Sequence, residues 1–350
     1  MSADRYLAVA GPRELREGEV SLADPGAGRV TVDITYTGIC GTDVHGYTDG
    51  HMLPPAVFGH EWTGSISAVG EGVQGLRAGQ RVVGGVGSAC GRCPQCVAGH
   101  ARNCDTVFAE ANGVDADAPD YGAFATRVQV SARRVIPVPE SLSDVEAALV
   151  EPTTVTFHAV RRVAAEYGAT TVVQGAGPIG LLTAQNARNA GAGPMIISEP
   201  SPARRALAGR LGFAHVVEPA DLRTALDELT AGLGADLVYE CTGVPSLLQP
   251  SAELVRRGGT LALLGYPLEN SSISYGDWQS RELTVIGSLA YHHEDFVGAI
   301  RGIAAGRIDV AALHTATFGL SSLRDVLEEL DSGRSEHTKV LIDPKRDGRA

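Results

Sequence analysis

The sequence predicts an α/β protein of two domains, a small antiparallel, barrel-like β domain followed by a doubly wound parallel sheet. Three observations support this prediction. Strand-like runs broken by glycine turns fill the first half, a glycine-rich turn stands between a strand and a helix at 175–180, and strands then alternate with helices. With 350 residues the chain is long enough for two domains.

Composition and charge exclude several classes of protein. A hydrophobic content of 44% with 20% charged residues is ordinary for a globular chain, and the net charge of −12 comes without a basic block. We therefore expect neither a nucleic acid nor an anionic membrane as a partner. No apolar run reaches the roughly 18 residues of a membrane span. Because the N-terminus also lacks the features of a signal peptide, we expect a cytoplasmic protein.

The first half reads as a series of short strands. In the run 29–36, apolar and polar residues alternate with the period of two that a half-buried strand requires. Further strand-like runs are 63–70, 80–83 and 122–130, and the stretch 105–120 is acidic and loop-like. Ser143, with Glu146 three residues later, predicts a capping box at the start of a helix.

The strand 29–36 leads into the stretch GICGTDVHGYTDGHMLPPAVFGHE, which brings Cys40, His45, His60 and Glu61 close together in the sequence. Thiolates, imidazoles and carboxylates are the ligands that zinc accepts. Thr42 and His45 can carry a proton out of a site that excludes bulk water. The alternative is that Cys40 is a small apolar core residue.

Four further cysteines have the spacing C-x2-C-x2-C-x7-C: Cys90, Cys93, Cys96 and Cys104. In a reducing compartment, clustered cysteines indicate a metal rather than disulfides. Four thiolates can close a tetrahedron around one zinc and leave no position for a substrate, which predicts a structural site. An iron–sulfur cluster and four unrelated thiols are the alternatives. A zinc ribbon that binds nucleic acid would need more fixed positive charge than Arg92 and Arg102 supply.

The second half begins with a nucleotide-loop pattern, because the apolar strand 170–174 is followed by GAGPIG and then by a helix-like run. Gly175 permits the tight turn, Gly177 lets a pyrophosphate come close, and Gly180 allows the helix and the strand to pack. Pro178 and Ile179 stand at the helix N-terminus, whose free N–H groups face the phosphates.

Glu199 follows the strand 195–198 and lies nineteen residues past Gly180. A carboxylate in this position accepts hydrogen bonds from ribose hydroxyls and repels a 2′-phosphate, which favours NAD over NADP. Arg204 and Arg205 follow closely and offer the alternative of a phosphate contact. The favoured interpretation is that they line the adenine side or the outer face of a helix.

Further strands are predicted at 216–217, 236–240, 260–264 and 283–286. The turns after the last three contain Thr242, Gly265 and Ser288, at carboxyl ends of strands, where such sheets bind ligands. The apolar runs 260–265 and 283–286 are suited to continue a sheet across a subunit boundary. Amphipathic helices around 293–305 and 321–331 and a strand at 339–342 are expected to return to the first domain.

The order GICGTDVH, GHE, the four-cysteine lobe, VEP and GAGPIG resembles the zinc-dependent medium-chain alcohol dehydrogenases along the whole chain. Within that family it is similar to the polyol, butanediol and L-threonine dehydrogenase branch. There one glutamate follows the ligand histidine and another replaces a zinc cysteine, the positions that Glu61 and Glu151 match. The resemblance implies a GroES-like β-barrel catalytic domain from 1–152 and 291–350, and a Rossmann cofactor domain from 153–290.

The resemblance also implies roles for individual residues. Cys40 and His60 hold a catalytic zinc, Glu61 or Glu151 completes its shell, and Thr42 and His45 relay the proton. The four-cysteine lobe holds a structural zinc, which makes two zinc ions per chain. Judged from its neighbours alone, Glu151 would be a helix-end carboxylate that faces water.

The implied activity is the transfer of a hydride between NAD and a polar secondary alcohol, such as a polyol, cyclitol, amino alcohol or vicinal diol. An L-threonine 3-dehydrogenase is the nearest alternative, and a non-catalytic, zinc-stabilised nucleotide-binding scaffold is the alternative of another class. A homo-oligomer, either a dimer or a tetramer, is expected from the family. Tyr47, Phe58 and Trp62 fit a substrate cleft and a packed core equally well.

Overall fold

The computed structural model of the chain describes residues 4–49, 57–85, 90–100, 103–105 and 122–346. Its Cα positions group into two compact units. Unit 1 comprises Met1–Glu151, His292–Ala304 and His314–Ala350, and unit 2 comprises Pro152–Tyr291 and Ala305–Leu313. The domain boundaries that the resemblance implies stay a prediction.

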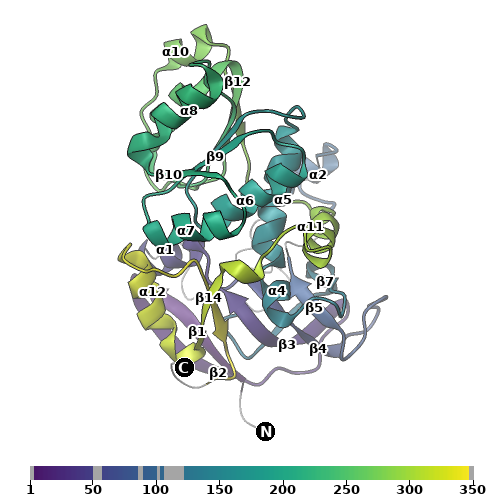
Figure 1. Cartoon of the computed structure of the whole chain (residues 1–350). Coiled ribbons are helices and arrows are strands. Elements are labelled where there is room, and N and C mark those ends of the chain that lie inside the picture. Colours follow the sequence, from purple (N-terminus) through teal and green to yellow (C-terminus); the bar gives the residue numbers. More distant parts are fainter. Residues whose placement is uncertain (1–3, 50–56, 86–89, 101–102, 106–121, 347–350) are drawn as a thin grey trace. The chain divides into compact units, whose positions relative to one another are not determined.

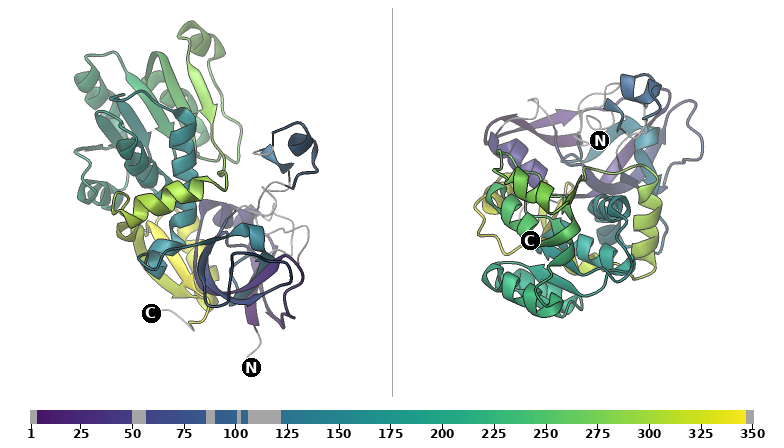
Figure 2. Two further views of the ribbon diagram at one scale, coloured as in Figure 1. Left: turned by 90° about the vertical axis from the view of Figure 1, so that its right-hand side faces the viewer. Right: turned by 90° about the horizontal axis from the view of Figure 1, so that it is seen from above.

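Unit 1 is built on a seven-stranded sheet. Six of the strands lie in the order β14-β15-β3-β4-β5-β7, and the seventh, β6, pairs with β3. Its strands are β3 (Arg29–Gly38), β4 (Glu61–Val69), β5 (Arg81–Gly84), β6 (Arg127–Ser131), β7 (Val135–Pro137), β14 (His314–Gly319) and β15 (Lys339–Asp343). The left view of Figure 2 shows the purple and blue strands of this unit curling round. A separate hairpin is formed by β1 (Asp4–Gly11) and β2 (Glu14–Val20).

Most pairings in this sheet are antiparallel, as the alternating sequence pattern predicts. The exception is the pair β14 and β15, which run parallel. The reason is the connection between them, because helix α12 (Leu323–Asp331) carries the chain back to the starting end of the sheet. The other helices that the structure describes in unit 1 are α1 (Gly41–Asp49), α2 (Pro94–Val97), α4 (Asp144–Ala148) and α11 (Asp295–Ala304), with 3-10 turns η2 (Ala132–Arg134) and η6 (Leu320–Ser322).

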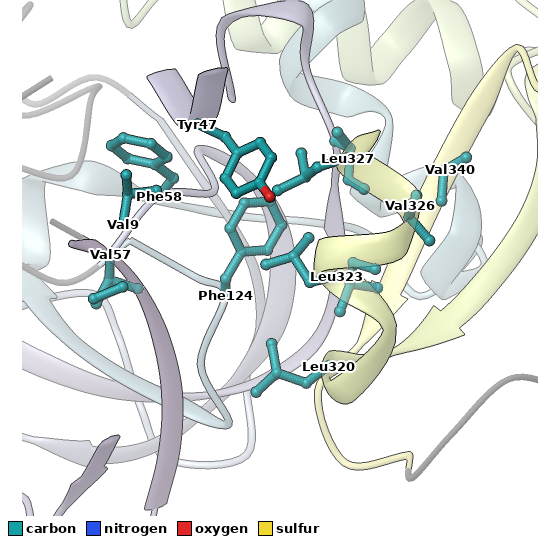
Figure 3. Packing of buried hydrophobic residues seen from close by; sticks show 13 residues of the cluster. Val9, Tyr47, Val57, Phe58, Phe124, Leu320, Leu323, Val326, Leu327 and Val340 are labelled. Carbon is teal, nitrogen blue, oxygen red and sulfur yellow. The ribbon is translucent and has the colours of Figure 1, made fainter. Parts of the chain in front are cut away.

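A buried apolar cluster joins α1 and α12 in unit 1. Tyr47 and Phe58 lie in it together with Phe124 and leucines of α12 (Figure 3). The Tyr47 hydroxyl donates a hydrogen bond of 2.7 Å to Glu328 Oε1. Trp62 lies in a second cluster with Val30 and other apolar residues of the sheet. These three aromatic side chains therefore belong to the core rather than to a substrate cleft.

Unit 2 is a six-stranded parallel sheet with the order β10-β9-β8-β11-β12-β13, which confirms the doubly wound prediction. Its strands are β8 (Thr171–Gln174), β9 (Met195–Ser198), β10 (His215–Val217), β11 (Ala235–Glu240), β12 (Val255–Leu263) and β13 (Thr284–Gly287). The connecting helices are α6 (Pro178–Asn189), α7 (Pro202–Arg210), α8 (Leu222–Thr230), α9 (Leu248–Leu254) and α10 (Tyr275–Ser280), with 3-10 turns η3 (Pro219–Asp221), η4 (Pro245–Leu247) and η5 (Ala311–Leu313). Figure 1 shows strands β9, β10 and β12 of this sheet together with helices α6, α7, α8 and α10.

The structure adds elements that the sequence pattern did not indicate. Strand β12 begins at Val255, well before the predicted 260. Its Arg-Arg-Gly-Gly stretch is polar and carries no apolar strand pattern, and it coincides with an irregularity in the pairing with β11. Helix α10 and strand β14 were also not predicted. In β14, polar residues alternate with only a few apolar ones, which weakens the strand signal.

The helix that was expected at Ser143 is confirmed, although it is short. The Glu146 backbone N–H donates to Ser143 Oγ at 3.2 Å, and the Ser143 N–H donates to Glu146 Oε2 at 2.8 Å. Helix α4 ends at Ala148, and the longer helix α5 (Val150–Val163) then begins, with Glu151 in its first turn. In the described part of the chain, every helix is too short or too polar to span a bilayer.

A core residue of unit 2 provides a test of this packing. Leu226 of α8 is fully buried among the apolar residues of β8, β11 and β12. We expect Leu226→Ala to lower the free energy of unfolding by about 2–5 kcal/mol, because it removes buried methyl groups and leaves a cavity. Urea denaturation followed by circular dichroism measures the effect.

The matched control is Leu233→Ala, since the Leu233 side chain is 74% exposed. This control should stay within about 0.5 kcal/mol of the unmodified chain. Equal effects of the two substitutions would contradict the assigned core.

Candidate metal centres and nucleotide loop

Cys40, His60 and Glu61 offer ligand atoms that all lie within 4.8 Å of one another. They meet because β3 and β4 pair antiparallel, with Gly38 opposite Glu61. Cys40 follows the end of β3, and His60 immediately precedes β4. A Cβ at Gly38 would collide with the Glu61 carboxylate, so the absence of a side chain there leaves room for that group.

Asp43, which the sequence reasoning did not single out, ties the two sides of this cluster together. Its Oδ2 accepts a 2.9 Å hydrogen bond from the Cys40 N–H, and its Oδ1 accepts one of 3.2 Å from the Gly59 N–H. The same Oδ1 lies 3.7 Å from His60 Nδ1. Asp43 therefore joins the Cys40 and Gly59 backbones beside the His60 ring, which is a position from which an outer carboxylate can orient a metal-binding histidine.

Lys339, at the start of β15, is the second residue that the sequence reasoning missed. Its Nζ forms an ion pair with Glu61 Oε2, and both side chains are only 2% exposed. Nζ also donates a 2.9 Å hydrogen bond to the Ile39 carbonyl. Strand β15 brings the lysine there because it pairs antiparallel with β3.

The electrostatics of this cluster favour positive charge. Burial alone would lower the pKa of His60, but Asp43, Cys40 and Glu151 together hold it well above the ordinary value. Burial opposes the charge of Lys339 in the same way, and Glu61 with Cys40 and Glu151 nevertheless raises its pKa. Burial also raises the pKa of the Asp43 carboxyl, against the opposing effects of His60 and the Cys40 N–H.

Glu151 is 5% exposed, so the interpretation of a carboxylate that faces water is wrong. Its negative charge contributes to the raised pKa values of both His60 and Lys339. The Thr42 hydroxyl lies 3.7 Å from Cys40 Sγ. His45 follows one turn later on α1 and is half-buried.

These residues fit a divalent cation. A thiol, an imidazole and a carboxylate converge, a second carboxylate lies near, and the pocket raises the pKa values of two bases in spite of their burial. Such a mixed sulfur, nitrogen and oxygen donor set is one that zinc accepts.

The four cysteines of the lobe also converge, with all four Sγ atoms within 4.8 Å of one another. The Sγ atoms of Cys90 and Cys96 are 4.0 Å apart, and those of Cys93 and Cys104 are 3.9 Å apart. Four sulfurs at zinc–sulfur bond length on a tetrahedron are about 3.8 Å apart. The lobe therefore has the size of a closed tetrahedral zinc site.

Backbone N–H groups point at the sulfurs of this lobe. The N–H groups of Arg92 and Cys93 donate to Cys90 Sγ at 3.4 and 3.3 Å, and the Cys90 N–H donates to Cys104 Sγ at 3.3 Å. Such donors stabilise thiolates. Crowding of the thiols has the opposite effect, because desolvation and the neighbouring Cys93 thiol raise the pKa of Cys96 to about 12.

The glycine-rich turn of unit 2 has the geometry of an anion-binding loop. Gly175 has φ +92°, which favours glycine, and a Cβ at Gly180 would collide with the Gly175 carbonyl. Gly177 is the N-cap of α6 and provides no side-chain cap, and a Cβ there would meet no protein atom within 4 Å. The first-turn N–H groups that follow Pro178 are therefore available to a phosphate.

Glu199 stands at the carboxyl end of β9 and is 3% exposed. Its Oε2 accepts a 2.7 Å hydrogen bond from the Ala176 N–H, and its Oε1 accepts one of 2.9 Å from the Ser201 N–H. Each carboxylate oxygen has a further lone pair for a ligand hydroxyl. The Arg205 guanidinium is already bound to the Glu199 carbonyl at 2.9 Å and to Glu218 at 2.5 Å.

Glu240 organises the turns on the other side of β8. Its Oε1 accepts a 2.7 Å hydrogen bond from the Thr242 N–H, and both its oxygens lie 3.2 Å from the Gly243 nitrogen. A Cβ at Gly265 would collide with Gly243 and with Glu240, so the two turns pack directly on each other. Ser288 follows β13 at the same edge of the sheet, and among the described residues its Oγ is buried without a hydrogen-bond partner.

Comparison with known protein families gives two matches. Residues 26–140 match the family described as alcohol dehydrogenase GroES-like domain, and residues 178–305 match the family described as zinc-binding dehydrogenase.

Curated relatives match nearly the whole chain. A sorbitol dehydrogenase of Bacillus subtilis is 32% identical and covers 95% of each chain. A 2-dehydro-3-deoxy-L-galactonate 5-dehydrogenase of Pseudoalteromonas atlantica is 34% identical and covers 98% of each chain. An L-threonine 3-dehydrogenase of Pyrococcus abyssi is 32% identical over 93% of this chain and 94% of its own.

Solved structures share the fold. The 2R,3R-butanediol dehydrogenase of Bacillus subtilis has a TM-score of 0.85 and 27% identity, and covers 98% of this chain and 100% of its own. An alcohol dehydrogenase of Escherichia coli in complex with NADH has a TM-score of 0.86, 27% identity and the same coverage. A dehydrogenase structure from Sinorhizobium meliloti with bound NADP has a TM-score of 0.86, 29% identity and again the same coverage.

The role of Asp43 as an orienting carboxylate can be tested through metal affinity. Asp43→Asn keeps the volume of the side chain but places an amide NH2 against a neighbouring donor. We expect zinc affinity at the Cys40–His60 cluster to fall about ten- to hundredfold, since outer-shell partners of metal ligands typically contribute that much. Competition with a chromophoric chelator measures the affinity.

Asp49→Asn is the control, because Asp49 is exposed at the last turn of the same helix. It should leave the chelator titration unchanged. An Asp43→Asn protein that holds zinc as tightly as the Asp49→Asn protein would refute the orienting role.

Proposed function

Because the chain belongs to the zinc-dependent medium-chain alcohol dehydrogenases, we propose that it oxidises a polar secondary alcohol whose neighbouring carbon carries a second hydroxyl or an amine. It is an oxidoreductase that acts on CH–OH groups with zinc and a nicotinamide cofactor. Polyol dehydrogenase is the class of activity to which its relatives point. The proposed substrates are polyols, cyclitols, amino alcohols and vicinal diols, and the proposed cofactor is NAD.

The observation that carries the substrate proposal is the carboxylate-rich donor set of unit 1. We assign Cys40 and His60 as ligands, with Glu61 or Glu151 completing the shell. Zinc, when bound there, supplies Lewis acidity to the substrate oxygen. A second oxygen or nitrogen on the adjacent carbon lets a substrate bind the same ion through two atoms.

Thr42 and His45 are the proposed proton relay. Thr42 carries its hydroxyl 3.7 Å from Cys40 Sγ, so a substrate hydroxyl beside that sulfur is within its reach. His45 follows on the same face of α1 and carries the proton on towards solvent. We propose that Cys90, Cys93, Cys96 and Cys104 hold a second, structural zinc.

For the cofactor we propose a site at the carboxyl edge of the parallel sheet. Gly175, Gly177, Pro178, Ile179 and Gly180 receive the pyrophosphate, and Thr242, Gly265 and Ser288 line the nicotinamide side. Glu199 binds the ribose hydroxyls, and its negative charge is the reason for proposing NAD. Arg204 lies in the first turn of α7, where its N–H donates to Ser201 Oγ, and we assign it to the adenosine side. In this scheme residues 1–152 with 291–350 carry the chemistry and 153–290 bind the cofactor.

L-threonine 3-dehydrogenase is the second candidate, supported by the relative from Pyrococcus abyssi. Threonine also carries a secondary alcohol next to an amine, so the same donor set serves it. The two candidates differ in the carboxylate that threonine brings, which requires a positive partner.

We further propose a homodimer formed through β13, the edge strand of the unit 2 sheet. Val285 on this strand is 40% exposed, and other large exposed apolar residues of the unit include Tyr266, Leu268, Tyr275 and Leu289. An exposed apolar edge invites pairing with a second strand. The clustered free thiols suit a reducing compartment, so we propose the cytoplasm as the location.

Substrate class is tested by following NADH absorbance with a panel of sugar alcohols, cyclitols, diols and threonine, each offered with NAD and with NADP. We expect the highest kcat/KM with NAD and a vicinal diol or polyol. The matched pair is 2,3-butanediol against 1,3-butanediol, because only the first presents adjacent hydroxyls on secondary carbons to one ion.

Metal analysis of the same protein is the control for this panel, and about two zinc ions per chain are expected. Equal turnover of the two butanediols would contradict two-atom binding. If protein that holds both zinc ions turns over none of these alcohols, the proposed substrate class is wrong.

The dimer is tested with Val285→Lys, which places a charge on the β13 edge. We expect the mass measured by light scattering after size-exclusion chromatography to fall to that of one chain, because a buried lysine at a strand edge disfavours pairing. Leu233→Lys, at a site remote from β13 in the sequence and 74% exposed, should keep the original mass. A Val285→Lys protein with undiminished mass would rule out this edge as the interface.

A further inference from the structure

The side chain of Gln174 is polar and buried, and its oxygen is not hydrogen-bonded to any residue that the structure describes. Gln174 is the last residue of β8, directly before the glycine turn, and only 7% of it is exposed. Its Oε1 is shielded from solvent and has no hydrogen-bond partner among the residues that the structure describes. A buried amide oxygen without a donor costs free energy comparable to a lost hydrogen bond, so a ligand donor is expected to complete it.

The position of Gln174 in the sheet places it beside the proposed site of the adenosine half of the cofactor. In the sheet it pairs with Ser198 on one side and with Glu240 on the other. Glu199, the proposed ribose ligand, is the residue after Ser198, so it lies about one strand spacing from Gln174. The side chain of Gln174 is on the same face of the sheet as Val172, which packs against α8 and α9.

The chemistry of the cofactor limits which of its groups could donate a hydrogen bond to Gln174 Oε1. Phosphate oxygens only accept hydrogen bonds, and the ribose hydroxyls are assigned to Glu199. The nicotinamide lies a whole pyrophosphate away from the ribose that Glu199 binds. On the adenosine side, the remaining group with two N–H donors is the 6-amino group of adenine.

We propose that the Gln174 carboxamide oxygen accepts a hydrogen bond from the adenine 6-amino group and makes the enzyme select adenine over deaminated purines. This inference rests on the proposed function, because it requires the dinucleotide to bind at this edge. Gln174 is then a residue that determines specificity at the cofactor site and takes no part in the transfer of hydride or proton.

The test compares two ligands that differ only in this amino group, NAD and nicotinamide hypoxanthine dinucleotide, by calorimetric titration of the zinc-loaded protein. The unmodified enzyme should bind NAD about tenfold or more tightly than the deaminated analogue, since the analogue presents a carbonyl to the buried oxygen. Gln174→Met should bind NAD about tenfold more weakly and bind both dinucleotides alike. ADP and IDP should repeat the pattern without the nicotinamide half.

The matched control is Gln279→Met, the same chemical change at an exposed residue of α10, which should retain the preference for NAD. Thermal unfolding of the two variants should agree within a few degrees, which separates recognition from folding. Equal binding of the two dinucleotides by the unmodified enzyme would overturn the inference and leave the proposed function standing. If Gln174→Met weakens the binding of NAD and of the deaminated analogue equally, the inference about adenine is likewise overturned. If the unmodified enzyme does not bind NAD at all, the proposed function itself is overturned.

Discussion

Compensation of buried charge is the constraint on which the metal pocket of unit 1 depends. Glu61 and Glu151 bring two buried carboxylates to the half-buried Cys40 thiol, and carboxylates repel one another strongly away from water. Lys339 offsets this charge through its ion pair with Glu61. The lysine reaches Glu61 only when β15 pairs with β3, so this C-terminal strand is coupled energetically to the candidate metal ligands of the N-terminal half.

At the carboxyl edge of the unit 2 sheet, buried carboxylates have a different role. Glu199 and Glu240 accept backbone N–H groups from the turns beside them, and so they hold those turns in one conformation. At the same edge, Gln174 Oε1 and Ser288 Oγ have no hydrogen-bond partner among the residues that the structure describes. A preorganised site in which the unpaired groups face the ligand binds at a lower entropic cost than one that must order itself.

Local patterns were sufficient for much of the fold and of the candidate sites. The capping box at Ser143 and the glycine turn before α6 depend on contacts between residues a few positions apart, so their sequences are diagnostic. The polar start of β12 and the weak pattern of β14 were not predicted, because their pairing with distant strands overrides a poor local signal. Tyr47 and Phe58 could be assigned to the core only from the packing against α12.

The sequence by itself determined the two-part α/β architecture, the cysteine lobe and the nucleotide loop, because these follow from periodicity and from short, fixed spacings. The tertiary structure alone revealed Asp43 as the link between Cys40 and Gly59, the burial of Glu151 and the pairing of Lys339 with Glu61. Those features depend on which strands become neighbours, and a charged residue carries no local mark of the partner it will meet across a sheet.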